Sequence, residues 1–313
     1  MSYEKVKRIG QVEIAVNDNV IEMAGVRDFN PDQIFDCGQC FRWEKDHKSW
    51  LGIAGARVAR VSYDSDGKLL RIEQLGSNEP SQDRLSDVAF WWNYFDLDRD
   101  YEKIKAYLSE GDPVMKEASN FGSGIRILRQ DFWEALISFI ISQNNNIPRI
   151  KKCINSLAEA LGEKVAELED GSLWYSLPNP EVLARATEEE LSACKLGYRS
   201  KYLIEAAKQY IRWTEERDMN AQWYVTRFDE ASKLEAFCGV GPKVANCVGL
   251  FGLGLIDSFP IDVWIRRIMN EFYGIPEKDL KGMKAYAAEH FAPYGGIAQQ
   301  YLFYRKLVDK SGK

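Results

Sequence analysis

The first part of the chain alternates between hydrophobic and polar or small residues. Val12, Ile14 and Val16 recur at every second position, which is the period of a half-buried β-strand. Residues 58–63 and 68–72 are two more strand-like runs, separated by an Asp-Ser-Asp-Gly segment with the composition of a turn. The pattern predicts a β-hairpin over 58–72 and a β-rich region up to about residue 75.

From about residue 83 the hydrophobic pattern becomes helical. We predict that Asp98 is the N-cap of a helix through Leu108, and that Gly111-Asp112-Pro113 ends it. Residues 131–143 are apolar on nearly every side, which is typical of a helix buried all round. The loop 144–146 follows, and Pro148 lies near the start of the next helix. Further helices are predicted over about 199–217, 229–237, 242–252, 263–272 and 296–308.

These elements predict an α+β protein with two domains. We expect an N-terminal domain over residues 1–122, built on an antiparallel β-sheet with helices, and a larger all-α domain over residues 123–313. The chain of 313 residues has room for about two domains of ordinary size.

The composition is that of a folded protein, with 45% hydrophobic and 12% aromatic residues. The polar start argues against a signal peptide, and no apolar run approaches the roughly 18 residues that span a bilayer. We therefore expect a protein that is not secreted and contacts no membrane, located in the cytoplasm and nucleoid, or in the nucleus of a eukaryote. We also expect it to act as a monomer, although nothing in the sequence fixes the oligomeric state. The six cysteines are scattered, and the single CxxC of Cys37 and Cys40 lacks the four ligands of a zinc site. We expect reduced thiols, no metal and no cofactor.

The net charge of −6 argues against a nucleic-acid partner only if the charge is spread evenly. It is segregated instead. Residues 159–190 carry nine acids against two bases, whereas residues 195–212 carry five bases against one acid and residues 120–155 carry five bases against two acids. This distribution permits a cationic face, although a charge run is usually only solvated surface.

Residues 238–247 have the pattern of two helices joined by a short glycine-containing hairpin. Gly239 and Gly241 precede Pro242, which occupies the favoured first position of a new helix. The small residues allow backbone N–H groups at the helix start to approach a phosphate, so Gly239 and Gly241 are candidates for a phosphate contact. Glycine and proline alone would favour an ordinary connection between helices.

Lys243 is the residue that makes this hairpin chemically distinctive. It lies in the first turn of the predicted helix, where the positive end of the helix dipole disfavours an ammonium, and Cys247 lies one turn later on the same face. The dipole is too weak by itself to activate an amine, so we expect Lys243 to be buried, at least when substrate closes the site. Asp262 precedes another predicted helix and is either its N-cap, a carboxylate for the reaction, or both.

Taken together, five motifs, the first of which is a pair of segments, carry a family resemblance. The pair Gly239-Val240-Gly241-Pro242-Lys243 and Pro260-Ile261-Asp262-Val263 resembles the helix-hairpin-helix DNA glycosylases that use a lysine nucleophile. The other segments resemble the 8-oxoguanine branch of that family: Gly38-Gln39-Cys40-Phe41-Arg42-Trp43, Ser142-Gln143-Asn144-Asn145-Asn146-Ile147, Leu196-Gly197-Tyr198-Arg199, and Pro293-Tyr294-Gly295-Gly296 with Ala298-Gln299 and Leu302-Phe303. The resemblance spans most of the chain. The partner that it implies is double-stranded DNA containing a damaged base.

The resemblance also implies a role for each site residue. Lys243 would attack C1′ of a flipped nucleotide and form a Schiff base that leads to strand cleavage, with Asp262 supporting the cationic transition state. The Gly38 carbonyl would accept from the N7–H of 8-oxoguanine, which guanine lacks. The base would lie between Cys247 and Phe303, with Gln299 on its Watson–Crick edge. The residues expected at the opposite cytosine are Asn144, Arg149 and Arg199, with Tyr198 as a wedge.

Some residues depart from the family pattern, and two other functions compete with the first. Trp264 stands where the family often has a histidine, Cys238 where it often has a proline, and Cys40 where it has a serine. A first alternative is a glycosylase for another damaged base, because the pocket and not the lysine chemistry selects the lesion. A second is a non-catalytic DNA-binding module, which the Lys243–Asp262 pair disfavours because phosphate binding requires neither residue.

Overall fold

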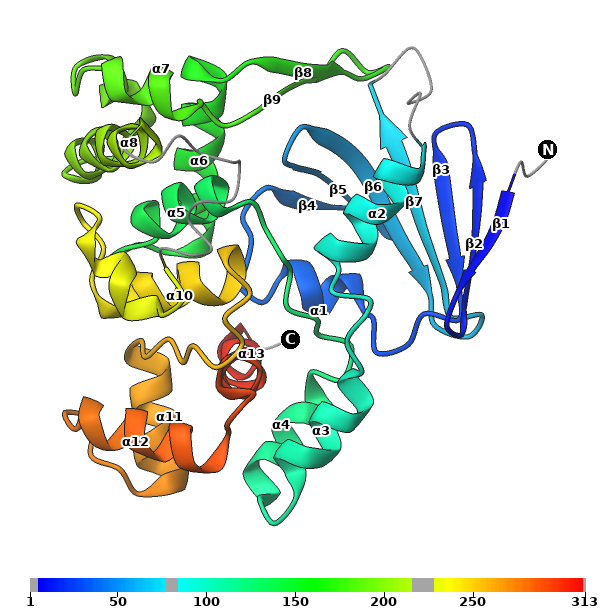
Figure 1. Ribbon diagram of the computed structural model, residues 1–313, viewed down its shortest axis with the longest axis vertical. Coiled ribbons are helices and arrows are strands. Elements are labelled where there is room, and N and C mark those ends of the chain that lie inside the picture. The colour runs from blue at the N-terminus through cyan, green and yellow to red at the C-terminus, as the bar shows by residue number, and fades with distance from the viewer. Residues whose placement is uncertain (1–4, 77–83, 216–227, 312–313) are drawn as a thin grey trace.

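The computed structural model describes residues 5–76, 84–215 and 228–311. Its N-terminal part contains a seven-stranded antiparallel sheet in the order β1-β2-β3-β7-β6-β5-β4 (Figure 1). The strands are β1 (Lys5–Ile9), β2 (Val12–Asn17), β3 (Val20–Ala24), β4 (Trp43–Asp46), β5 (Ser49–Ala54), β6 (Arg57–Asp64) and β7 (Leu69–Leu75). The predicted hairpin is confirmed, because β6 pairs with β7 and the register ends at Asp64 opposite Leu69.

Helices α1 (Pro31–Phe35) and α2 (Arg84–Tyr94) share a core with the sheet. Phe35 of α1 stacks on Trp43 with the ring centroids 4.2 Å apart, and Trp91 of α2 meets Trp43 edge-on at 6.3 Å. The sheet therefore buries an aromatic layer against these two helices, and Trp43 stands at its centre.

Helices α3 (Tyr101–Ser109) and α4 (Pro113–Phe121) follow, and the N-cap predicted for α3 is wrong. Asp100, not Asp98, caps the helix by accepting from Lys103 N. Asp98 instead forms an ion pair with Arg129 at 2.9 Å, a long-range contact that the local pattern does not encode. Gly111-Asp112-Pro113 separates the two helices as predicted, and Asp112 caps α4.

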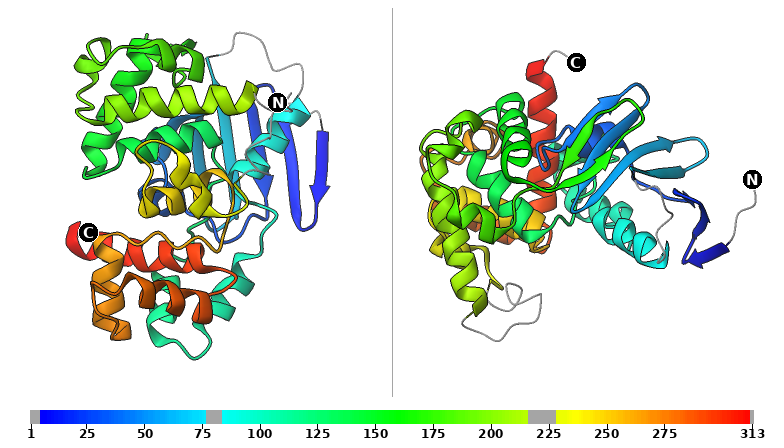
Figure 2. Two further views of the ribbon diagram at one scale, coloured as in Figure 1. Left: turned by 60° about the vertical axis from the view of Figure 1, so that its left-hand side comes forward. Right: turned by 90° about the horizontal axis from the view of Figure 1, so that it is seen from above.

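The second half is helical (Figure 2). The helices are α5 (Phe132–Ile141), α6 (Ile147–Leu161), α7 (Pro180–Arg185), α8 (Arg199–Glu215), α10 (Pro242–Gly252), α11 (Val263–Tyr273), α12 (Leu280–His290) and α13 (Gly295–Ser311), with the 3₁₀ helices η1 (Glu190–Cys194) and η2 (Ala231–Ala236). Nine of the ten residues of α5 are buried, as its all-round apolar pattern predicts. None of the helices within the described ranges is long and apolar enough to cross a membrane.

The structure confirms the fold class and corrects details. Residues 229–237 were expected to be an α-helix but form the shorter 3₁₀ helix η2, and α12 was not predicted. The strands β8 (Lys164–Glu167) and β9 (Leu173–Tyr175) form a small hairpin within the half predicted to be all-α. Residues 216 and 217 of one predicted helix lie outside the described residues. The domain boundary at residue 122 stays a prediction; α3 and α4 lie in the same hydrophobic cluster as α5 and α10.

Candidate active site

A small cavity lies where α10, α13, the start of α11 and the segment after α1 meet. It is lined by Cys37, Gly38, Phe139, Lys243, Cys247, Phe251, Pro260, Asp262, Gln299, Gln300 and Phe303. All six residues predicted to act on the base or the sugar are in this set, although they are up to 265 positions apart between Gly38 and Phe303. The fold therefore brings the predicted catalytic pair and the predicted base-binding residues into one pocket.

The hairpin before α10 has the backbone geometry that its glycines predict. Gly239 has φ +79°, and a Cβ added there would lie 2.5 Å from Cγ and Cδ2 of Tyr202. Gly241 is the N-cap of α10 and has no side chain to cap it, and Pro242 begins the helix. The backbone N–H groups of the first turn are therefore left without a side-chain cap, which is the arrangement that suits an anion.

Lys243 extends from this first turn and is half-buried. Its Nζ lies 3.3 Å from Ser142 Oγ and 5.4 Å from the centroid of the Phe139 ring. Cys247, one turn along α10, is buried; burial raises the pKa of its thiol, and the nearby positive charge of Lys243 opposes that rise. Lys243 is therefore only partly buried, because one side of its side chain packs on α5.

Asp262 is the N-cap of α11, as predicted. Its Oδ1 accepts from Trp264 N at 2.9 Å and from Ile265 N at 2.8 Å. Burial raises the pKa of the Asp262 carboxyl, and these two amides and the charge of Lys243 pull the pKa back down. The cap therefore fixes the carboxylate at the wall of the pocket, so the capping role and a chemical role are compatible.

Another part of the pocket wall is the backbone at Gly38, which lies in the left-handed region that favours glycine. This residue has φ +77°, and a Cβ added to it would lie 3.3 Å from Cε1 of Phe303. Two buried glutamines that were given no role from the sequence hold this segment. Gln300 Nε2 donates to Cys37 O at 2.7 Å, and Gln39 Nε2 donates to Ile34 O and to Arg126 O, both at 2.9 Å. The sequence signal that could have identified these two glutamines is their position next to Gly38 and Gln299 in the segments that resemble the family.

Three of the four residues predicted at the opposite base are exposed: Asn144 and Tyr198 lie in the loops before α6 and α8, and Arg149 lies in α6. Asn144 has φ +46°, and its Nδ2 donates to Tyr198 Oη at 3.2 Å. Tyr198 is 48% exposed, and Arg149 is exposed in the first turn of α6.

Arg199 differs from the others because it is 4% exposed. Its Nε donates to Gln143 O at 2.9 Å, its Nη1 to Leu196 O at 3.1 Å and its Nη2 to Asn144 O at 3.2 Å. Its guanidinium therefore stabilises the loop that carries Asn144 and is not an exposed donor. The sequence could not indicate this, because the three carbonyls come from two separate loops.

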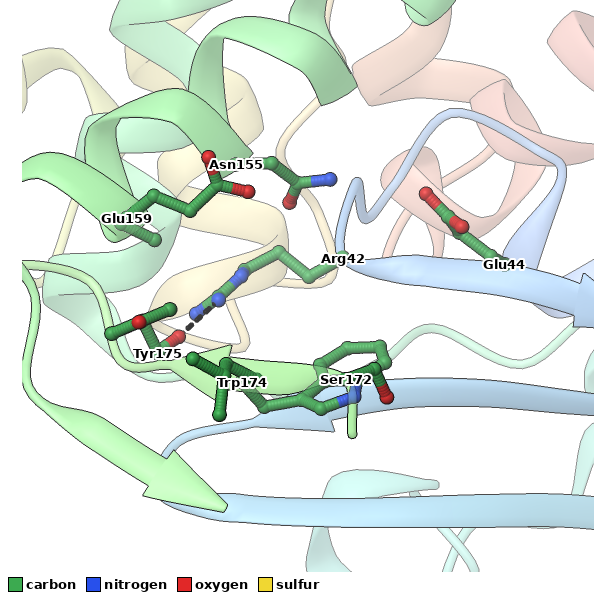
Figure 3. A pocket seen from close by; sticks show the side chains of 9 residues that line it. Arg42, Glu44, Asn155, Glu159, Ser172, Trp174 and Tyr175 are labelled. Carbon is green, nitrogen blue, oxygen red and sulfur yellow. Dashed lines mark hydrogen bonds between the residues drawn. The ribbon is translucent and has the colours of Figure 1, made fainter. Parts of the chain in front are cut away.

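A second cavity, of about 180 Å³, lies between β4, α6 and β9 and contains none of the predicted site residues (Figure 3). Arg42, from the same segment as Gly38, crosses it and donates to Tyr175 O. Its Nη1 also pairs with Glu134 Oε1 of α5 at 3.5 Å. Burial raises the pKa of the Glu134 carboxyl to about 7, against the stabilising charge of Arg42. These contacts tie the Gly38 segment to the helical half.

Comparison with known proteins gives a consistent set of relatives. Residues 23–136 match the family described as 8-oxoguanine DNA glycosylase, N-terminal domain, and residues 137–293 match the HhH-GPD superfamily of base excision DNA repair proteins. The N-glycosylase/DNA lyase of Saccharomyces cerevisiae is 31% identical over 282 residues, covering 84% of this chain and 71% of that protein.

Two solved structures are similar over the whole chain. A structure of MBOgg1 with a low-affinity DNA ligand is 38% identical with a TM-score of 0.83, and the match covers 100% of both chains. The 8-oxoguanine glycosylase/lyase of Clostridium acetobutylicum, in complex with double-stranded DNA containing cytosine opposite 8-oxoguanine, is 36% identical with a TM-score of 0.80, and again both chains are covered completely.

Proposed function

The chain belongs to the 8-oxoguanine DNA glycosylase family of helix-hairpin-helix repair proteins and is a DNA glycosylase with lyase activity. We propose that it excises 8-oxoguanine opposite cytosine with Lys243 as the nucleophile. One observation carries the proposal. Lys243 and Asp262 line the same cavity as Gly38, Cys247, Gln299 and Phe303, so a lysine, a carboxylate and the four residues assigned to the base meet at one site.

The proposed reaction begins with the neutral amine of Lys243. Its lone pair attacks C1′ of the flipped nucleotide, the bond from C1′ to N9 breaks, and the base leaves with that electron pair and accepts a proton. Opening of the sugar then gives a Schiff base between Nζ and C1′. Loss of a proton from C2′ expels the 3′ phosphate, which is the lyase step. Asp262 stabilises the positive charge that develops on the sugar and helps to move protons.

Recognition of the lesion is assigned to the walls of the pocket. The Gly38 carbonyl accepts from the N7–H of 8-oxoguanine and repels the unprotonated N7 of guanine, so discrimination arises partly by rejection. Cys247 and Phe303 enclose the base, and Gln299 binds its Watson–Crick edge. A Cβ added at Gly38 would lie 3.3 Å from the Phe303 ring, so the Gly38 backbone is close to that ring, which supports this arrangement.

Recognition of the opposite cytosine is assigned to the exposed residues outside the pocket. Arg149 donates to the acceptors N3 and O2 of cytosine, Asn144 assists, and Tyr198 fills the gap left by the flipped base. Arg199 joins them only after the loop of Asn144 rearranges, since its donors are bonded to backbone carbonyls. Gly239 and Gly241 bind the DNA phosphates through backbone N–H groups.

The alternative of a non-catalytic binding module is not supported, because the relatives are named glycosylase/lyases and the Lys243–Asp262 pair is present. The alternative of another lesion is tested by the range of substrates. Excision assays on a panel of duplexes should give release of 8-oxoguanine and none of undamaged guanine. Comparable rates on both bases would contradict the role of Gly38.

Trapping with borohydride tests the nucleophile. Borohydride reduces an imine, so the wild-type protein should become covalently attached to DNA containing 8-oxoguanine. Lys243→Gln should lose both cross-linking and strand cleavage and still bind the lesion, because phosphate contacts and the pocket supply most of the affinity. Asp262→Asn should be slower and retain some trapping. Full trapping by Lys243→Gln would place the nucleophile on another residue.

A further inference from the structure

Ser142 lies within hydrogen-bonding distance of the Lys243 amine. It is the C-cap of α5, and its Oγ donates to Phe139 O at 2.8 Å and lies 3.3 Å from Lys243 Nζ. A serine hydroxyl has one proton to donate and two lone pairs to accept with. Because that proton is directed to the Phe139 carbonyl, Lys243 is the donor and Ser142 the acceptor in this second hydrogen bond.

The two helices that carry these side chains are held closely together. A Cβ added at Gly252 of α10 would lie 2.9 Å from Cβ of Ala135 of α5. The rings of Phe139 and Phe251 stack with their centroids 5.3 Å apart. Since Phe139 also holds the Ser142 hydroxyl, the acceptor has a fixed position relative to the first turn of α10.

The direction of the contact relative to the pocket is informative. Lys243 lines the cavity, whereas Ser142 does not. The hydroxyl therefore holds the amine from outside the pocket. In a neutral amine that donates an N–H to Ser142, the lone pair points in another of the tetrahedral directions of the nitrogen and is not occupied by the hydroxyl.

We propose that Ser142 is a positioning residue that aims the Lys243 amine at the bound sugar. This inference rests on the proposed function, because only a nucleophilic lysine needs to be aimed. The lysine side chain has four rotatable bonds, and a single fixed acceptor selects the rotamer from which attack occurs. Ser142 also restrains the amine without lining the base site, so it contributes to the rate of attack and not to lesion binding.

Removing the hydroxyl tests the proposal. Single-turnover trapping with borohydride on an 8-oxoguanine duplex should be about tenfold slower or more for Ser142→Ala, the size expected for a lost hydrogen bond to a charged or reacting group. The dissociation constant for the same duplex should stay within about twofold. Ser142→Thr keeps the hydroxyl and should recover most of the rate. Ser138→Ala, one turn earlier on α5, removes a hydroxyl to which Lys243 does not donate among the described residues, and is the matched control.

Each result has one meaning. Trapping by Ser142→Ala at the wild-type rate would overturn the proposal. A slower variant that loses melting temperature and DNA affinity to the same degree, with no rescue by Ser142→Thr, would make Ser142 a helix cap and nothing more. Failure of the wild-type protein to be trapped at all would instead overturn the proposed function, and the lesion-binding measurement would show whether the pocket was intact.

Discussion

Alanine substitutions at the two hairpin glycines should separate folding from DNA binding. A Cβ on Gly239 would lie 2.5 Å from Cγ and 2.7 Å from Cβ of Tyr202. Those atoms lie close to the backbone of α8, so rotation of the ring cannot relieve the contact. A Cβ on Gly241 meets no atom within 4 Å, and the φ of Gly241 is −97°.

The expected destabilisation follows from these two environments. At Gly239, alanine in the left-handed region costs about 1–2 kcal/mol. Overpacking against Tyr202 adds about 1–3 kcal/mol, for a total of about 2–5 kcal/mol. That is a large part of the roughly 5–15 kcal/mol that keeps a domain folded. At Gly241 the loss should stay under about 1 kcal/mol, the size of a change at an N-cap.

Urea unfolding measures the loss of stability, and fluorescence anisotropy with labelled duplexes measures the loss of DNA binding. Gly239→Ala should lower the unfolding midpoint strongly. Gly241→Ala should keep the midpoint but weaken binding to damaged and undamaged duplexes by the same factor, because contacts to phosphates carry no information about the base. A wild-type midpoint for Gly239→Ala would refute the packing argument. Unchanged affinity for Gly241→Ala would remove the phosphate contact.

Two further predictions concern charged residues. Burial raises the pKa of Glu134 from 4.5 to about 7. Between these two pH values the folded protein therefore binds a proton that the unfolded chain has released. The stability that Glu134 contributes is complete below about pH 4.5 and is lost as the pH rises through 7. Urea unfolding should therefore show a larger loss of stability between about pH 5 and 8 for the wild type than for Glu134→Gln, and parallel losses would contradict the shift. Arg149→Ala should weaken binding to a cytosine-paired lesion more than to an adenine-paired one at unchanged melting temperature. Arg199→Ala should lower the melting temperature as well, because it removes donors to Gln143 O and Asn144 O; equal losses on both duplexes would make either arginine a phosphate contact.

The features that depend on local free energy could be predicted from the sequence. The alternation around Ile14, the turn between β6 and β7, the all-round apolar pattern of α5 and the cap at Asp262 each reflect interactions within a few residues. The hairpin before Lys243 is of the same kind, since glycine and proline fix it through their own backbone preferences. For this reason the fold class and the location of α10 could be predicted.

Which of several similar residues caps a helix or binds a carbonyl depends on the tertiary structure. Asp98 and Asp100 are equally good caps in sequence, and the contact of Asp98 with Arg129 leaves Asp100 to cap α3. The sequence pattern indicates an exposed donor at Arg199, but in the structure its guanidinium donates to backbone carbonyls of the loops at 143–144 and 196. Gln39, Gln300 and Ser142 act on partners up to 263 positions away. Those contacts exist because packing brings distant segments together, and no local period or cap in the sequence encodes that arrangement.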